Sequence, residues 1–119
     1  MDFFECPFNS MYNQYTAQNM PSNSFQLPQE AKDTVNRICR GGTLPFAKDG
    51  EVFYNRPIGS PRRQLLPRWR DQSRDYYRSY TVITPGARNR GCRRIVTGGN
   101  PPFKFYYTDD HYLSFHPIS

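Results

Sequence analysis

Apolar residues recur every three to four positions in one stretch of the chain, between residues 28 and 42. The residues that carry this pattern are Ala31, Val35, Ile38 and Cys39. The spacing is typical of a helix that buries one face. Glu30 near its start and the Gly41-Gly42 pair at its end match the usual boundaries of a helix. We therefore predict one helix over this stretch.

After this helix, short runs of apolar and aromatic residues are separated by Gly and Pro, a pattern typical of strands joined by turns. The runs are 51–56, 77–83, 92–97, 104–108 and 112–116. One helix followed by about five strands predicts an α+β domain, in which the helix covers one face of a twisted antiparallel sheet.

The first 27 residues differ from the rest. They are rich in Asn, Gln, Ser, Tyr and Met, and their only charged residues are Asp2 and Glu5. We interpret residues 1–27 as a flexible or partner-ordered N-terminal arm and residues 28–119 as the folded domain. Because the chain carries a formal net charge of +6 and the arm −2, the folded part carries +8.

Most basic residues of the chain are arginines, with 13 Arg and 3 Lys against 10 acidic residues. The planar guanidinium group suits bidentate binding of phosphate, so this composition favours a phosphate-bearing partner. Five arginines crowd around Trp69 in the segment 57–75, which we predict to be a long basic loop. Such a loop fits a nucleic acid, a solvated face or an acidic protein about equally.

No run of about 18 apolar residues is present, so we expect no transmembrane helix and no membrane partner. The first ten residues lack the cationic and apolar regions of a secretory signal. Cys6, Cys39 and Cys92 cannot all pair within one chain, and their spacing matches no zinc pattern. We therefore expect reduced thiols, no metal site and an intracellular location.

Three segments are more specific: VFYNR at 52–56, YTVITPGARNRGCRRIVTG at 80–98 and YYTDDHYLSF at 106–115. With LPQEAKDTVNRI in the helix, they resemble the small microbial guanyl-preferring ribonucleases, the barnase-like family, and are most similar to its actinobacterial secreted branch. The resemblance implies an endoribonuclease without metal or cofactor. Such an enzyme cleaves single-stranded RNA on the 3′ side of guanosine through a 2′,3′-cyclic phosphate.

The resemblance also implies roles for individual residues. His111 takes the position of the general acid, a task that suits an imidazole because its pKa lies near neutrality. Arg90 and Arg94 take the two phosphate-holding positions, and Arg93 should face away from Arg94 because successive strand residues alternate. The implied substrate-binding residues are Phe53, Tyr54, Asn55, Arg56 and Tyr112.

Within the base-reading segment the residue types leave alternatives open. Phe53 is as compatible with a core-facing strand position as with stacking on a base. Asn55 is a better candidate for base contact because its amide is both donor and acceptor, although Asn is also common where a strand runs into a tight turn.

Two positions depart from the family pattern. Pro57 stands where the family has the Glu that pairs with guanine, and Ser79 stands where it has the catalytic Glu. A serine hydroxyl cannot act as a base unless another base lies beside it. The groups that we considered as substitutes are Asp75, Asp109, Asp110 and His116, and none is well placed. His116 in particular should face away from His111, five residues earlier in an extended strand.

These observations predict a ribonuclease-fold protein that binds RNA in a cationic groove formed by Arg90, Arg94, His111 and Tyr112. Its cleavage activity should be weak, altered or lost, because removal of a general base typically lowers the rate about 10² to 10⁴-fold. One alternative is a non-catalytic subunit that docks into a larger assembly through residues 1–27 and 57–75. Another is an intracellular toxin domain held by an acidic inhibitor.

Overall fold

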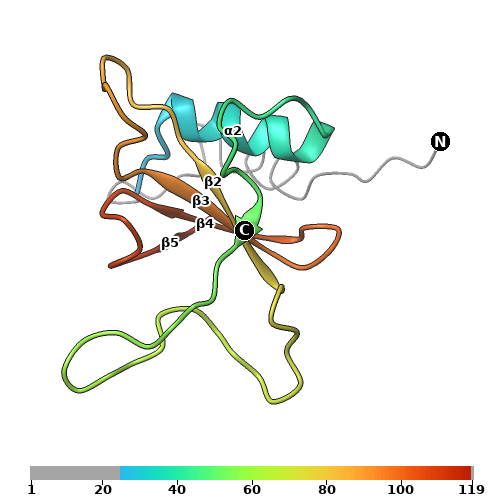
Figure 1. Cartoon of the computed structure of the whole chain (residues 1–119), viewed down its shortest axis with the longest axis vertical. Coiled ribbons are helices and arrows are strands. Elements are labelled where there is room, and N and C mark those ends of the chain that lie inside the picture. The colour runs from blue at the N-terminus through green and yellow to red at the C-terminus, as the bar shows by residue number, and fades with distance from the viewer. Residues whose placement is uncertain (1–24, 119) are drawn as a thin grey trace.

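The structure is a computed structural model that describes residues 25–118 (Figure 1). Its elements are α2 (Gln29–Arg40), β1 (Glu51–Val52), β2 (Tyr77–Thr81), β3 (Arg94–Gly98), β4 (Lys104–Thr108) and β5 (His116–Pro117). One helix and a five-stranded antiparallel sheet make up the α+β fold predicted from the sequence. The predicted arm lies outside the described residues up to position 24.

The five strands form one sheet in the order of the sequence, and every neighbouring pair is antiparallel. In this register Ser79 lies opposite Val96, and Val96 lies opposite Tyr106. These residues share one face of the sheet, because side chains directly opposite one another point to the same side. On the other edge of β2, Ser79 lies opposite Glu51.

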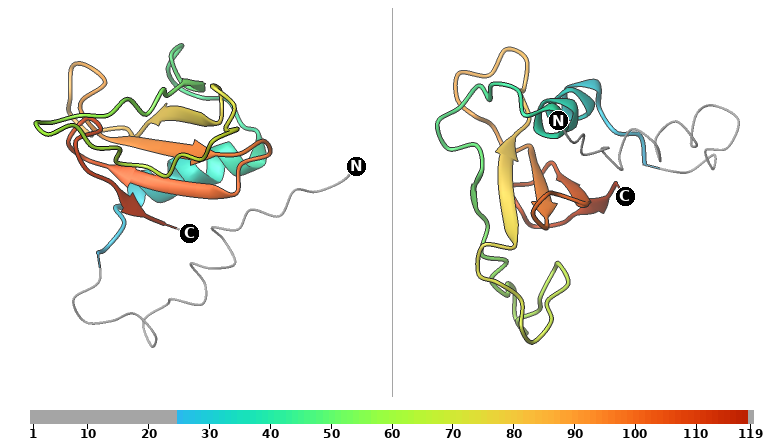
Figure 2. Two further views of the ribbon diagram at one scale, coloured as in Figure 1. Left: turned by 90° about the horizontal axis from the view of Figure 1, so that it is seen from below. Right: turned by 90° about the vertical axis from the view of Figure 1, so that its right-hand side faces the viewer.

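The helix α2 covers the other face of the sheet (Figure 2). Ala31 and Val35 are fully buried against that face. The core cluster contains Ala31, Val35, Val82, Ile95, Phe105 and Tyr107. Gly41 ends the helix in the left-handed conformation, with φ 68°, which glycine adopts without strain. Leu27 also packs against this cluster, so the end of the predicted arm belongs to the folded domain.

Two of the predicted strands are wrong in extent. The run 51–56 pairs only at Glu51–Val52, and Asn55 takes a positive φ of 54° that breaks the extended conformation. The run 112–116 is not a strand over most of its length. His111 and Tyr112 have φ values of 55° and 78°, so the chain turns there, and pairing resumes only at His116–Pro117.

The predicted basic loop 57–75 contains no named strand and extends away from α2 (Figure 1). Its middle is nevertheless anchored to the sheet. Leu66 is buried with Tyr77, Val96 and Tyr106 on the face that the helix leaves open. The Tyr77 hydroxyl donates a hydrogen bond of 2.6 Å to the carbonyl of Pro67. The loop is therefore held to the domain by buried contacts.

The expectation of three reduced thiols is wrong. Cys39 is disulfide-bonded, whereas Cys92 is free and exposed. An odd number of cysteines prevents the pairing of all three but permits one disulfide bond. Because Cys39 is disulfide-bonded, the cysteines of this chain give no support to an intracellular location. Within residues 25–118, no helix is long and apolar enough to cross a bilayer.

Candidate active site

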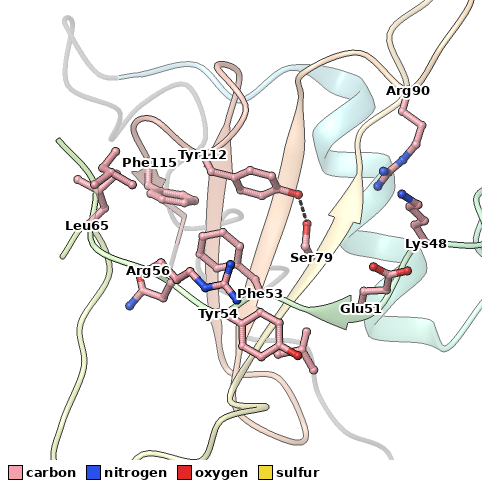
Figure 3. A pocket seen from close by; sticks show the side chains of 13 residues that line it. Lys48, Glu51, Phe53, Tyr54, Arg56, Leu65, Ser79, Arg90, Tyr112 and Phe115 are labelled. Carbon is pink, nitrogen blue, oxygen red and sulfur yellow. Dashed lines mark hydrogen bonds between the residues drawn. The ribbon is translucent and has the colours of Figure 1, made fainter. Parts of the chain in front are cut away.

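A pocket of about 360 Å³ opens on the helix-free face of the sheet (Figure 3). All five residues predicted to bind substrate line it: Phe53, Tyr54, Asn55, Arg56 and Tyr112. Ser79 from β2 and Arg90 from the loop before β3 line it as well. The fold thus brings the base-reading segment beside the position where the family resemblance placed the catalytic carboxylate.

The residues predicted to be catalytic meet in a second, more open hollow of about 710 Å³. Arg90, Arg94 and His111 all line this hollow. Because Arg90 also lines the first pocket, the two hollows adjoin at its side chain. The convergence of two guanidinium groups and one imidazole is the arrangement predicted from the sequence.

Arg94 is a buried cation that pairs with no carboxylate of residues 25–118. Its side chain is only 3% exposed, and its Nη1 donates to the carbonyl oxygens of Gly91 at 3.0 Å and Arg93 at 2.8 Å. Its Nε is buried with no partner in the part of the chain that the structure describes. A buried charge normally needs a counter-charge. Arg94 is therefore prepared to bind an anion.

The Arg90 side chain is hydrogen-bonded to β2. Its Nε donates to the Thr81 hydroxyl at 3.0 Å. The backbone N–H of Thr81 in turn donates to the Asp49 carboxylate at 2.8 Å. This contact orients the guanidinium group, and the Arg90 side chain lines both hollows.

Arg93 faces away from Arg94, as predicted. Its Nη2 pairs with the Glu30 carboxylate at 2.9 Å and donates to the carbonyl of Ile83. The hydrogen bond from Arg93 lowers the pKa of Glu30. Arg93 therefore links β3 to α2 and belongs to the scaffold, whereas Arg94 belongs to the site.

The turn that carries His111 is built around Asp110. The Asp110 carboxylate accepts hydrogen bonds from the hydroxyl of Thr108 at 2.8 Å and from the backbone N–H groups of Leu113 and Ser114 at 3.1 and 3.0 Å. Burial opposes ionisation of Asp110, but these hydrogen bonds outweigh it and lower its pKa. Asp110 thus shapes the turn and is not free to act as a base.

The Ser79 hydroxyl is hydrogen-bonded to the Tyr112 hydroxyl at 2.5 Å. The Tyr112 ring stacks on Phe53, with ring centroids 4.8 Å apart. Phe53 packs against the core cluster of the open face and also lines the pocket. The core-facing position expected for Phe53 is therefore confirmed, and its ring also forms part of the pocket wall.

The interpretation of the Asn55 amide as a reader of the base is wrong. Its Nδ2 donates to the carbonyl of Leu66 at 2.9 Å, and its Oδ1 accepts from the backbone N–H of Leu66 at 3.3 Å. Both ends of the amide therefore anchor the loop 57–75. Tyr54, by contrast, is 52% exposed, and the guanidinium groups of Arg56 and Arg74 lie 5.2 and 5.8 Å from its ring centroid.

The pocket contains one acidic residue that was not predicted from the sequence, Glu51. Glu51 lines the pocket together with Lys48, and it lies directly across from Ser79 in the sheet. The substitutes considered earlier lie elsewhere. Asp75 pairs with Arg78, and His116 stacks on Phe25 with ring centroids 4.0 Å apart. The pairing of β1 with β2 places Glu51 opposite Ser79. The register of these two strands could not be predicted from the sequence.

A helix-backed antiparallel sheet that presents two guanidinium groups and an imidazole on its open face defines a phosphate-binding protein of the nuclease type. The model of the ribonuclease family matches residues 10–119 of the sequence. The chain belongs to this family.

The chain is similar to several actinobacterial ribonucleases. It is 51% identical to guanyl-specific ribonuclease Sa of Kitasatospora aureofaciens over 89 residues, which cover 75% of this chain and 82% of the relative. It is 44% identical over 89 residues to guanyl-specific ribonuclease St of Saccharopolyspora erythraea, with 75% and 77% of the two chains covered.

Solved structures of ribonuclease Sa2 are also similar. The structure with mononucleotides has a TM-score of 0.63 at 40% identity, with 76% of this chain and 83% of that chain covered. The complex with guanosine-2′-cyclophosphate has a TM-score of 0.62 at 39% identity, covering 77% and 86%. These relatives support RNA cleavage and do not favour the alternatives of a docking subunit or an inhibited toxin.

Proposed function

We propose that the protein binds single-stranded RNA across the two adjoining hollows and cleaves it slowly by attack of a ribose 2′-hydroxyl on the neighbouring phosphate. The observation that carries this proposal is the buried Arg94 guanidinium, unpaired within residues 25–118 and placed beside Arg90 and His111. A phosphodiester supplies the missing anion. Single-stranded RNA also supplies bases that stack on exposed aromatic rings.

The chemistry follows from the three side chains. The 2′-oxygen forms a bond to phosphorus as it loses its proton, and the bond from phosphorus to the 5′-oxygen breaks. Arg90 and Arg94 stabilise the charge that develops on the phosphoryl oxygens. The His111 imidazolium gives its proton to the departing 5′-oxygen. The products are a 2′,3′-cyclic phosphate and a free 5′-hydroxyl.

We propose that the base is bound in the pocket lined by Phe53, Tyr54 and Arg56. The exposed Tyr54 ring offers a stacking surface flanked by cations. Relatives named guanyl-specific suggest guanine as the preferred base. Pro57 supplies no carboxylate for the guanine edge, so selectivity should be weaker than where a Glu stands there.

The side chain at position 79 supplies no carboxylate to the site. Ser79 donates or accepts a single hydrogen bond with Tyr112, and neither hydroxyl is a base at neutral pH. Compared with a site that carries a carboxylate at this position, we expect turnover to be reduced by up to about 10² to 10⁴-fold. RNA binding depends on the arginines and should persist.

A cleavage assay tests the proposal. The wild-type protein, His111→Ala and Ser79→Glu are incubated with an RNA oligonucleotide that contains one guanosine, and the products are separated and identified by mass. We expect slow formation of a 2′,3′-cyclic phosphate, loss of that product in His111→Ala and faster formation in Ser79→Glu. Equal cleavage by wild type and His111→Ala would contradict the assignment of the acid.

A further inference from the structure

Resting on the proposed function, we infer that Glu51 is the general base, supplied by the strand beside the one that carries Ser79. In this arrangement the site retains a catalytic carboxylate, which comes from Glu51 on β1 instead of from position 79 on β2.

The register places Glu51 and Ser79 face to face. The two residues are direct partners in the antiparallel pair β1 and β2. Side chains at such positions point to the same face of the sheet, with Cβ atoms about 4.5–5.5 Å apart. A glutamate side chain spans most of this separation. Its carboxylate can therefore occupy the space beside the short Ser79 side chain.

The backbone that leads into Glu51 is fixed. The Asp49 carboxylate accepts hydrogen bonds from the backbone N–H groups of Thr81 at 2.8 Å and Phe46 at 3.2 Å. The N–H of Gly50 donates to the carbonyl of Ser79 at 2.8 Å. These bonds tie the start of β1 to β2, so the position of Glu51 against Ser79 is set by the fold.

The Glu51 carboxylate is free to accept a proton. Neither ion pair between described residues involves it, and no hydrogen bond to its side chain is found within residues 25–118. It is also the one carboxylate among the described residues that line this pocket. The carboxylates of Asp49, Asp75 and Asp110 are each occupied by hydrogen bonds.

Glu51 and His111 line different hollows, and Arg90 lines both of them. Glu51 lines the hollow that contains Ser79, His111 lines the hollow that contains Arg94, and Arg90 is common to both. Figure 3 shows the side chains of Glu51, Lys48 and Arg90 at one end of the pocket. Because the attacking and leaving oxygens lie roughly opposite each other on the phosphorus, base and acid must approach a phosphate from different sides. A phosphate held by Arg90 meets this requirement.

The step balances without any further reactant. The Glu51 carboxylate takes the proton of the 2′-hydroxyl as the 2′-oxygen bonds to phosphorus. The bond to the 5′-oxygen breaks, and His111 supplies the proton that this oxygen gains. A carboxylate is ionised at neutral pH and can serve as the acceptor. Lys48, in the same pocket, adds positive charge where the RNA backbone passes.

The test compares Glu51→Gln with Asp71→Asn in the full chain, on the same RNA oligonucleotide. Both substitutions remove one carboxylate charge, but Asp71 is exposed in the loop 57–75 and lines neither hollow. We expect Glu51→Gln to lower kcat about 10² to 10⁴-fold, to bind RNA as tightly as the control and to lose the acidic limb of the pH–rate profile. Asp71→Asn should cleave at the wild-type rate.

A second variant separates a lost base from a damaged site. Ser79→Glu introduced into the Glu51→Gln protein should recover cleavage, because it returns a carboxylate to the pocket from the neighbouring strand. The inference would be overturned if Glu51→Gln cleaved RNA at the wild-type rate and kept the acidic limb of the pH–rate profile. It would also be overturned if the double variant cleaved no faster than Glu51→Gln.

The same data distinguish failure of this inference from failure of the proposed function. If the wild-type protein binds the oligonucleotide but leaves it intact, Glu51 is not a general base, and RNA binding by the arginines stands. If the protein neither binds nor cleaves RNA at low salt, the proposed function fails as well.

Discussion

The side-chain amide of Asn55 holds the backbone of Leu66 from both sides, donating to its carbonyl at 2.9 Å and accepting from its N–H at 3.3 Å. Asn55 is buried and lies at a positive φ of 54°. Asn55, which was predicted to contact the base, thus anchors the basic loop 57–75 to the domain. The loop and the pocket wall are therefore parts of one structural unit.

Asn55→Ala should destabilise the protein. It removes two buried hydrogen bonds, each with a net contribution of about 1 kcal/mol, and leaves Leu66 backbone groups unsatisfied. We expect the free energy of unfolding, measured in urea, to fall by about 2–3 kcal/mol. Gln72→Ala is the control, because its amide also reaches a loop carbonyl, that of Pro67, but at an exposed site. Equal losses for both variants would contradict the role of Asn55.

Arg94→Gln should weaken RNA binding without loss of stability. The substitution removes a buried charge that has no carboxylate partner in the described part of the chain. We expect the slope of log K against log salt to decrease by about 0.7, as for one lost contact to a single-stranded phosphate. The free energy of unfolding should be unchanged or higher.

Arg93→Gln provides the matched control for Arg94→Gln. Its guanidinium pairs with Glu30 on the helix side of the sheet, so its loss should lower stability and leave the salt dependence of RNA binding unchanged. If Arg93→Gln and Arg94→Gln weaken RNA binding equally, Arg94 does not contact the phosphate.

Pro57→Glu should increase the preference for guanosine. A carboxylate at this position can accept hydrogen bonds from the guanine edge, and hydrogen bonds to charged groups contribute about 1.5–3 kcal/mol. We therefore expect the ratio of kcat/KM for oligonucleotides with a single guanosine or a single adenosine to rise about tenfold or more. An unchanged ratio would show that the base is bound away from the segment 52–57.

Alkaline pH should destabilise the protein as its buried tyrosines ionise. Burial, aided by neighbouring Tyr106, raises the pKa of Tyr77 to about 12, and burial also raises the pKa of Tyr80 and Tyr107. The folded state binds these protons more tightly than the unfolded state, so this stabilisation is complete below about pH 10 and is lost as the pH rises toward 12.

Urea unfolding followed at a series of alkaline pH values measures this dependence. Tyr77→Phe should show a shallower fall in stability with pH, because it removes one of the shifted groups. Its stability at neutral pH should be about 1 kcal/mol lower, since the hydrogen bond from Tyr77 to the Pro67 carbonyl is lost. A free energy of unfolding that stays constant up to pH 12 would contradict this account.

Local patterns predicted the parts of the fold that depend on neighbouring residues. The helix follows from the spacing of Ala31 and Val35, and the strand over residues 104–108 was predicted with its observed bounds. The strand predicted at 112–116 failed because His111 and Tyr112 take left-handed conformations, which are uncommon for residues other than glycine.

The site was predicted only where the family resemblance supplied positions. It identified Arg90, Arg94 and His111, which do converge. Glu51 was missed because its relation to Ser79 depends on the register of β1 and β2, a property of the folded sheet. The role of Asn55 was misread for a related reason, since its partner lies eleven residues away in a loop without periodicity.

The most direct test of the central claim is a crystal structure with a dinucleotide that lacks the reactive 2′-hydroxyl and cannot be cleaved. We expect its phosphate to contact both Arg90 and Arg94, with the 5′-oxygen facing His111 and the 2′ carbon of the ribose facing Glu51. A phosphate bound only along the loop 57–75, away from both guanidinium groups, would contradict it.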